Sequence, residues 1–131
     1  MKLLSILCCY LLYAIVNTAM LTAGQGKLPE QVKEAFKNGN AKVISGYCCE
    51  KVELSILGKD GQYNKEKLVE VLKDFFSKNV PRLFVIIFEG GKESSQYVIG
   101  KLTTDKDSYR INLLINNGII QQLKIELYNE D

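Results

Sequence analysis

The second half of the chain is a series of segments with strand character, and the short turns between them restrict the folds open to it. Residues 109–115 alternate apolar side chains with Arg110 and Asn112, which is typical of a half-buried strand. Asn117-Gly118 then predicts a two-residue hairpin. Turns this short require antiparallel pairing of the strands that they join. Strands are predicted at residues 83–88, 97–103, 109–115 and 121–127.

Helical periodicity dominates the sequence before these strands. The clearest helix begins after Asn64, a suitable N-cap, and ends at Asn79, ahead of the X-Pro step at Pro81. One apolar stripe runs along it at helical spacing. The stripe consists of Leu68, Val71, Leu72, Phe75 and Phe76. Two shorter helices are predicted at 28–36 and 41–46, and a strand at 52–56.

The order of these elements is helix, helix, strand, helix and then four strands, which predicts an α+β fold. We expect the helices to pack on one face of a curved antiparallel sheet. Residues 83–88, with the sequence LFVIIF, are apolar on both faces. This segment is therefore expected at the centre of the sheet, beneath the helices.

The N-terminus has the three parts of a secretory signal peptide. Met1-Lys2 gives a positive start, residues 3–16 are an uninterrupted apolar run, and residues 17–26 are small and polar. The apolar run is short for a membrane span. We predict a signal peptide at 1–24, an exported domain at 25–131, and a periplasmic or secreted location. The alternative is an uncleaved N-terminal membrane anchor.

The composition argues against several kinds of chemistry. The chain of 131 residues carries a net charge of only +2, so it lacks the basic field that attracts nucleic acid. It has no histidine, which removes the commonest general base and the commonest metal ligand together. We therefore predict no metal site, no cofactor and no nucleic-acid partner.

The stretch ILGKDGQYNK, residues 56–65, places two glycines and a lysine between a strand and a helix, as phosphate-binding loops do. A Walker loop needs Lys and then Ser or Thr directly after its second glycine. Here Lys59 lies between Gly58 and Gly61. We therefore interpret Lys59-Asp60-Gly61 as a tight turn without a phosphate site.

Removal of the signal peptide leaves Cys48 and Cys49 as the remaining cysteines. Two thiols cannot close a zinc site, the pair lacks the C-x-x-C spacing, and a disulfide between neighbours is strained. We predict that one thiol lies in the core and the other points outward. The alternative is a pair of redox-labile or intermolecular thiols.

Residues 40–78, together with the strands as far as Glu126, resemble the nuclear-transport-factor-2-like superfamily. Its members fold a curved sheet round helices into a cone, and they include ketosteroid isomerase-like enzymes and many non-catalytic domains. Within it the chain is similar to an uncharacterised family of small exported bacterial domains. That similarity rests on VEL, ILG, Gly and Tyr in residues 52–63, LKDFF in 72–76 and QQL-IE in 121–126. The resemblance implies the cone fold, and it transfers no catalytic residue.

Enzymes of this superfamily hold Asp, His, Tyr or Arg side chains inside the cone, whereas the expected inward positions here are mostly aliphatic. No acid–base pair can be assembled without histidine. We therefore expect no enzyme, and instead a non-catalytic binding or accessory domain that takes a small apolar ligand or peptide in the cone. The candidate residues at the fringe of this pocket are Tyr63, Glu89, Tyr97, Tyr109 and Gln121.

Two alternative functions stay open at this point. One is a cavity enzyme of isomerase or dehydratase type that uses a tyrosine with a carboxylate. The other is a structural domain that forms a homodimer through the outer face of its sheet, which the resemblance implies is the usual dimer surface. The apolar content expected on that face is modest. Its residues are expected to be Arg110, Asn112, Leu114, Gln122, Lys124, Glu126 and Tyr128.

Overall fold

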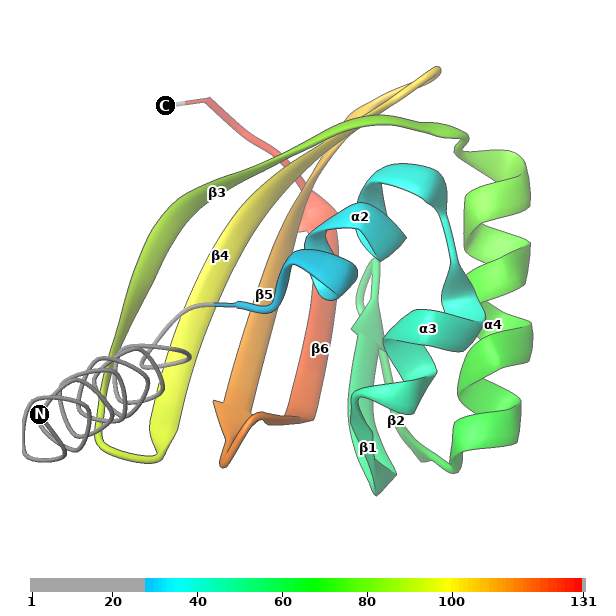
Figure 1. Ribbon diagram of the computed structural model, residues 1–131. Coiled ribbons are helices and arrows are strands. Elements are labelled where there is room, and N and C mark those ends of the chain that lie inside the picture. The colour runs from blue at the N-terminus through cyan, green and yellow to red at the C-terminus, as the bar shows by residue number, and fades with distance from the viewer. Residues whose placement is uncertain (1–27, 131) are drawn as a thin grey trace, which may run out of the picture.

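Three helices lie on one face of a six-stranded sheet in the computed structural model, which describes residues 28–130 (Figure 1). This confirms the predicted α+β architecture. The predicted signal peptide at 1–24 lies outside the described residues. Within the described part, no helix is both long and apolar enough to cross a membrane. The elements are α2 (Glu30–Asn38), α3 (Ala41–Gly46), β1 (Cys48–Ile56), β2 (Lys59–Tyr63), α4 (Lys65–Lys78), β3 (Pro81–Lys92), β4 (Ser95–Thr104), β5 (Ser108–Asn116) and β6 (Ile119–Leu127).

The helices begin and end where the sequence places capping residues. The Asn64 side chain accepts a hydrogen bond from the Lys67 backbone N–H at 2.8 Å, which satisfies one free donor of the first turn of α4. Asn40 caps α3 in the same way. Gly39 ends α2 with φ 67°, a left-handed conformation that glycine adopts without strain.

The β1–β2 hairpin adds a strand that the sequence did not predict. Its two-residue turn is Leu57-Gly58, with φ 51° and 87°, and Lys59 begins the returning strand. The predicted turn at Lys59-Asp60-Gly61 is therefore wrong. Gly61 suggested the turn, but it lies inside β2, opposite Leu54.

The strand order across the sheet is β2-β1-β6-β5-β4-β3. Neighbouring strands run antiparallel except for β1 and β6, which are parallel. They can be parallel because α4 and four strands separate them along the chain, so no tight turn dictates their direction. As a result, the first and last strands of the fold meet near the middle of the sheet (Figure 1).

The expectation that residues 83–88 lie at the centre of the sheet is wrong. They belong to β3, which forms one edge and pairs only with β4. Phe84 and Ile86 face the core, whereas Leu83 and Val85 are about half exposed. The inner face of the strand is thus apolar because it packs against α2, whereas burial beneath the helices does not explain the apolar outer face.

The core lies between the helices and the concave face of the sheet. Phe36 on α2 is fully buried and stacks on Phe84 of β3 with ring centroids 5.0 Å apart. Phe75 on α4 meets Tyr109 of β5 edge-on, also at 5.0 Å. The largest fully buried side chains are Val32, Phe36, Ile44, Leu54, Leu68, Leu72, Leu102, Ile111, Leu113, Ile120, Leu123 and Ile125.

Candidate functional site

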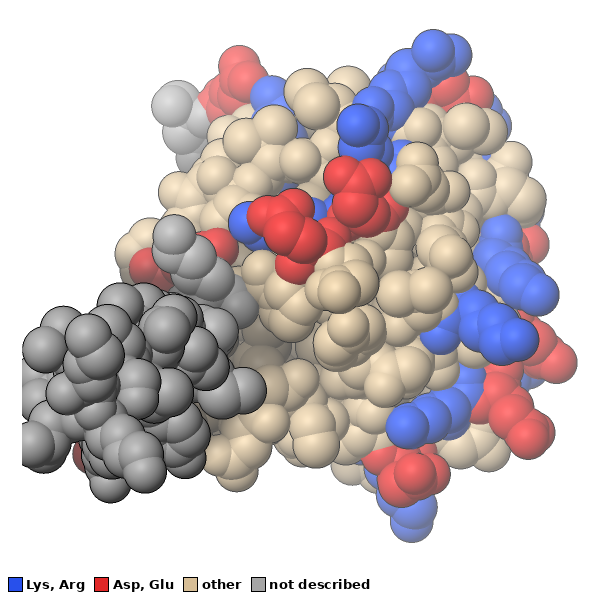
Figure 2. All heavy atoms as spheres, viewed as in Figure 1, with Lys and Arg blue, Asp and Glu red and all other residues tan. Residues whose placement is uncertain are grey.

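A cleft of about 340 Å³ opens between the C-terminal half of α4 and the β1–β2 hairpin; we call it the α4 cleft. Its walls are apolar, and its rim is polar. Both sides of the rim carry charge, with Lys59 on the hairpin and Asp74 and Lys78 on α4. The surface of α4 presents side chains of both signs to solvent (Figure 2). The lining residues are Leu54, Ile56, Leu57, Lys59, Tyr63, Val71, Asp74, Phe75, Lys78 and Asn79.

Pairing along the hairpin explains why these side chains meet. Opposite residues of an antiparallel pair point to the same face. Ile56 lies opposite Lys59, so the aliphatic stem of the lysine shares the cleft face with the isoleucine. Val71 belongs to the predicted apolar stripe of α4, but it lines the cleft and is only partly buried.

Tyr109 is held in place beside this cleft by the residue that ends α4. Its hydroxyl donates a hydrogen bond of 2.7 Å to the Asn79 side-chain oxygen, and the Asn79 amide donates to the Phe75 carbonyl at 3.1 Å. Burial, followed by the Asp107 and Asp105 carboxylates, raises the pKa of the Tyr109 phenol. Tyr109 is therefore a protonated donor that joins β5 to α4.

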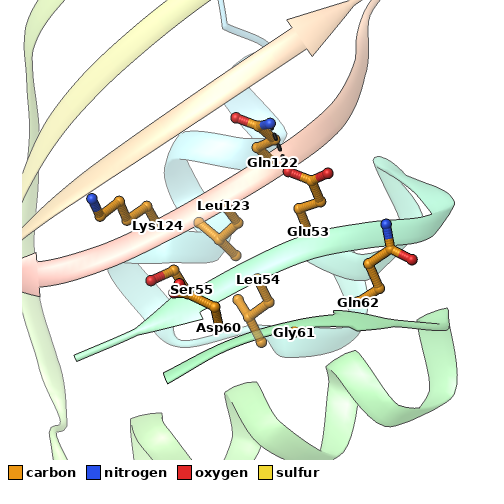
Figure 3. Close-up of a pocket in the computed structure, with 9 residues that line it drawn as sticks. All are labelled: Glu53, Leu54, Ser55, Asp60, Gly61, Gln62, Gln122, Leu123 and Lys124. Carbon is orange, nitrogen blue, oxygen red and sulfur yellow. Dashed lines mark hydrogen bonds between the residues drawn. The ribbon is translucent and has the colours of Figure 1, made fainter. Parts of the chain in front are cut away.

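A second, larger depression of about 450 Å³ lies on the outer face of the sheet, across β2, β1 and β6; we call it the outer groove (Figure 3). The Gln122 amide donates a hydrogen bond of 2.7 Å to the Glu53 carboxylate across the β1–β6 pair. Lys124 is paired with Glu126 at 3.4 Å. Six polar residues line the groove together with Leu54, Gly61 and Leu123, namely Glu53, Ser55, Asp60, Gln62, Gln122 and Lys124.

The other half of the outer face carries a group of exposed apolar side chains. In β4 the inward residues Val98 and Leu102 are buried, so their neighbours Tyr97 and Lys101 face outward. Leu83, Val85 and Phe88 of β3 pair with outward residues of β4, so they lie on the same outer face. Their side chains are 45–53% exposed. We call this surface the β3–β4 patch. It consists of Leu83, Val85, Ile87, Phe88 and Tyr97.

The two cysteines occupy different environments, as predicted. Cys48 is buried, and its thiol donates to the Ile44 carbonyl oxygen at 3.3 Å. Burial, and then the neighbouring Cys49, raises the pKa of Cys48 from 9.0 to about 12, although Lys65 opposes this shift. Cys49 is partly exposed and donates to the Lys51 carbonyl oxygen at 3.2 Å. Both thiols are free.

We expect one thiol of the domain to react quickly with a disulfide reagent such as Ellman's reagent, and the second to react only after unfolding. The reactive form is the thiolate, which burial disfavours at Cys48. The pKa of Cys48 is higher in the folded state than in the unfolded state. The buried thiol therefore contributes fully to stability below pH 9.0, and this contribution is lost as the pH rises toward about 12. The measurement is the release of the reagent's thiolate with time, with and without urea.

The Cys48→Ala and Cys49→Ala variants assign the two rates. Fast reaction should disappear only in Cys49→Ala, and the fall in unfolding free energy above pH 9.0 should be shallower only in Cys48→Ala. Equal fast reaction of both thiols in the folded domain would contradict the burial of Cys48.

The five candidate pocket residues do not converge on one site. Tyr63 lines the α4 cleft, and Tyr109 reaches its edge through Asn79. Gln121 is the extra residue at a β-bulge in β6, beside the shallow depression that contains both cysteines. Glu89 and Tyr97 lie on adjacent strands at the far edge of the sheet, and both are exposed.

Several residues of the α4 cleft were absent from the sequence-based candidates. Leu57, Lys78 and Asn79 come from the ends of elements, where a pattern of periodicity carries little information. Val71 was assigned to the core because it fits the helical stripe. Among the described residues, no group of three or more His, Cys, Asp or Glu side chains is arranged to hold a metal ion.

Comparison with known proteins identifies both a family and a fold. The family described as "Domain of unknown function (DUF4783)" matches residues 29–126. A DUF4783 protein from Bacteroides ovatus of known crystal structure is 32% identical, with a TM-score of 0.75; the match covers 82% of this chain and 100% of that one. A second, from Bacteroides fragilis, is 33% identical, with a TM-score of 0.70 and coverage of 78% and 100%.

A more distant similarity shows the fold alone. A cystatin-like domain of unknown function from Nostoc punctiforme is 10% identical, with a TM-score of 0.62 and coverage of 77% and 73%. No curated protein sequence matches the chain. Both Bacteroides structures are matched over their whole length by about four fifths of this chain, so in those two structures the fold is complete without a counterpart of the remaining fifth.

Proposed function

The chain belongs to the DUF4783 family, and on that premise we propose that it is a small exported binding domain without catalytic activity. The α4 cleft carries the proposal. It combines apolar walls with a few polar groups at its rim, which is the usual composition of a small-molecule site. Its volume of about 340 Å³ suits a small apolar ligand or a short apolar segment of a peptide. The sequence of residues 1–24 supports export.

The arrangement of titratable groups favours binding over catalysis. General acid–base chemistry needs two groups with separated pKa values that face one substrate. The Tyr109 hydroxyl is engaged with Asn79, and its raised pKa keeps it protonated. The Asp74 carboxylate at the rim is paired with Lys78 at 3.1 Å and faces solvent. Neither group is poised to move a proton to or from a molecule in the cleft.

A neutral apolar dye such as Nile red tests the binding site directly. We expect it to bind the wild-type domain and to bind Val71→Asn about tenfold more weakly, because one apolar wall contact becomes polar. Val69→Asn is the matched control, since Val69 is also a partly buried valine of α4 but does not line the cleft. Fluorescence titration measures both affinities. Absence of dye binding, or equal weakening by the two variants, would reject the α4 cleft as the site.

A second candidate function is assembly into a homodimer through the outer sheet face. The β3–β4 patch favours it, because large apolar side chains gather there instead of being scattered singly over the surface. The apolar content of this face is greater than its predicted residues suggest, since β3 contributes side chains that were expected in the core. The two candidates are compatible, because the α4 cleft and the patch lie on different parts of the sheet.

A further inference from the structure

We propose that the ligand of the α4 cleft is an amphiphilic anion, with an apolar chain inside the cleft and a carboxylate at Lys59. This inference rests on the proposed function of the cleft as a binding site. It adds the chemical class of the ligand and the two residues that select it, Leu57 and Lys59. Both belong to the β1–β2 hairpin, at the mouth of the cleft.

The charges around the rim leave one cation available for an anionic group. Three charged side chains line the cleft, namely Lys59, Asp74 and Lys78. Lys78 and Asp74 neutralise each other at 3.1 Å, with both side chains about two-thirds exposed. Lys59 has no ion-pair partner among residues 28–130. The rim therefore favours a negative group over a positive one.

The position of Lys59 connects its charge to the apolar wall. Because Lys59 lies opposite Ile56 in the hairpin, its methylene stem runs along the cleft face while its ammonium group stays in water. A ligand that packs on Ile56 thus brings the end of its chain toward a cation. This arrangement suits a molecule with one apolar part and one anionic end.

Leu57 provides an independent indication of a ligand at this mouth. It occupies the first position of a two-residue turn with φ 51°, where asparagine, aspartate or glycine is favoured and a bulky apolar residue is strained. Its side chain is 51% exposed, so burial does not offset the strain. An apolar residue kept in a strained and exposed position is explained if it contacts a ligand.

Decanoate and decanol, which share a chain and differ in charge, test the inference with the chain from residue 25 onward. We expect calorimetry to show that decanoate binds more tightly than decanol at low salt, and that salt reduces the difference. Lys59→Gln should weaken decanoate binding roughly fivefold, as expected for one exposed ion pair, and leave decanol binding unchanged. Lys73→Gln is the control, because Lys73 is a lysine of α4 that does not line the cleft.

Leu57→Asn separates ligand contact from folding. Asparagine tolerates the left-handed conformation, so this variant should unfold at a higher temperature than the wild type while it binds both compounds more weakly. If decanol and decanoate bind equally and Lys59→Gln changes neither affinity, the anionic ligand class is wrong although the cleft still binds. If neither compound binds the wild type, the proposed function fails together with the inference.

Discussion

Replacing Phe36 with alanine is expected to lower the free energy of unfolding by about 3–5 kcal/mol. Phe36 is fully buried, and its ring stacks on Phe84 with a centroid distance of 5.0 Å. Because α2 is only nine residues long, its stability depends on this contact with β3 more than on its own backbone hydrogen bonds. Removal of the ring leaves a cavity between the helix and the edge strand. Urea unfolding followed by circular dichroism measures the loss.

Phe88→Ala is the matched control, since Phe88 is the same residue type in the same strand as Phe84 but is 53% exposed. Its truncation should cost less than about 1 kcal/mol when both variants are measured at a protein concentration where the domain is monomeric. A loss of unfolding free energy for Phe36→Ala as small as that expected for Phe88→Ala would mean that α2 does not depend on Phe36. Phe36→Leu should recover part of the lost stability by filling some of the cavity.

The elements of the fold were predictable where local chemistry determines them. The stripe and the Asn64 cap of α4 depend on neighbours within one helix, and both are confirmed, except that Val71 of the stripe is only partly buried. The β5–β6 hairpin at Asn117-Gly118 also depends on local turn chemistry, and it too is confirmed. The cone architecture agrees with the similarity to cystatin-like structures.

The position of β3 in the sheet was not predictable from its own residues. LFVIIF is compatible with a central strand and with an edge strand whose outer face is covered by something else. The order of strands depends on the parallel pairing of β1 with β6, which joins segments far apart in the sequence. Periodicity in one segment contains no information about such a distant partner.

The candidate site was predicted only in part, for a similar reason. Two of the five candidate residues, Tyr63 and Tyr109, lie at or beside the α4 cleft. Strict alternation failed for Gln121, because a bulge inserts an extra residue into β6. Leu57 was not among the candidates because Gly61 favoured a predicted turn at Lys59-Asp60-Gly61, whereas the turn is formed by Leu57-Gly58.

We expect Val85→Glu to convert a wild-type homodimer into a monomer, with a dissociation constant at least about 100-fold higher. Val85 lies in the middle of the β3–β4 patch and is 45% exposed. A two-fold interface on this patch would bury the new carboxylate from each of the two copies without a partner. In the monomer the same carboxylate lies opposite Lys101 and stays in water, so folding is affected little. Sedimentation velocity over a concentration series measures the dissociation constant.

Ser55→Glu provides the control on the same face of the sheet. Ser55 lies in the outer groove opposite Lys124, so this variant also introduces a carboxylate next to a lysine, but within the polar half of the face. If only the apolar half forms the interface, Ser55→Glu stays dimeric, and both variants unfold at nearly the wild-type urea concentration. Dissociation of both variants would indicate an interface that spans the whole outer face. A wild-type domain that remains monomeric at every concentration would contradict self-association, and the β3–β4 patch would then need a partner other than a second copy.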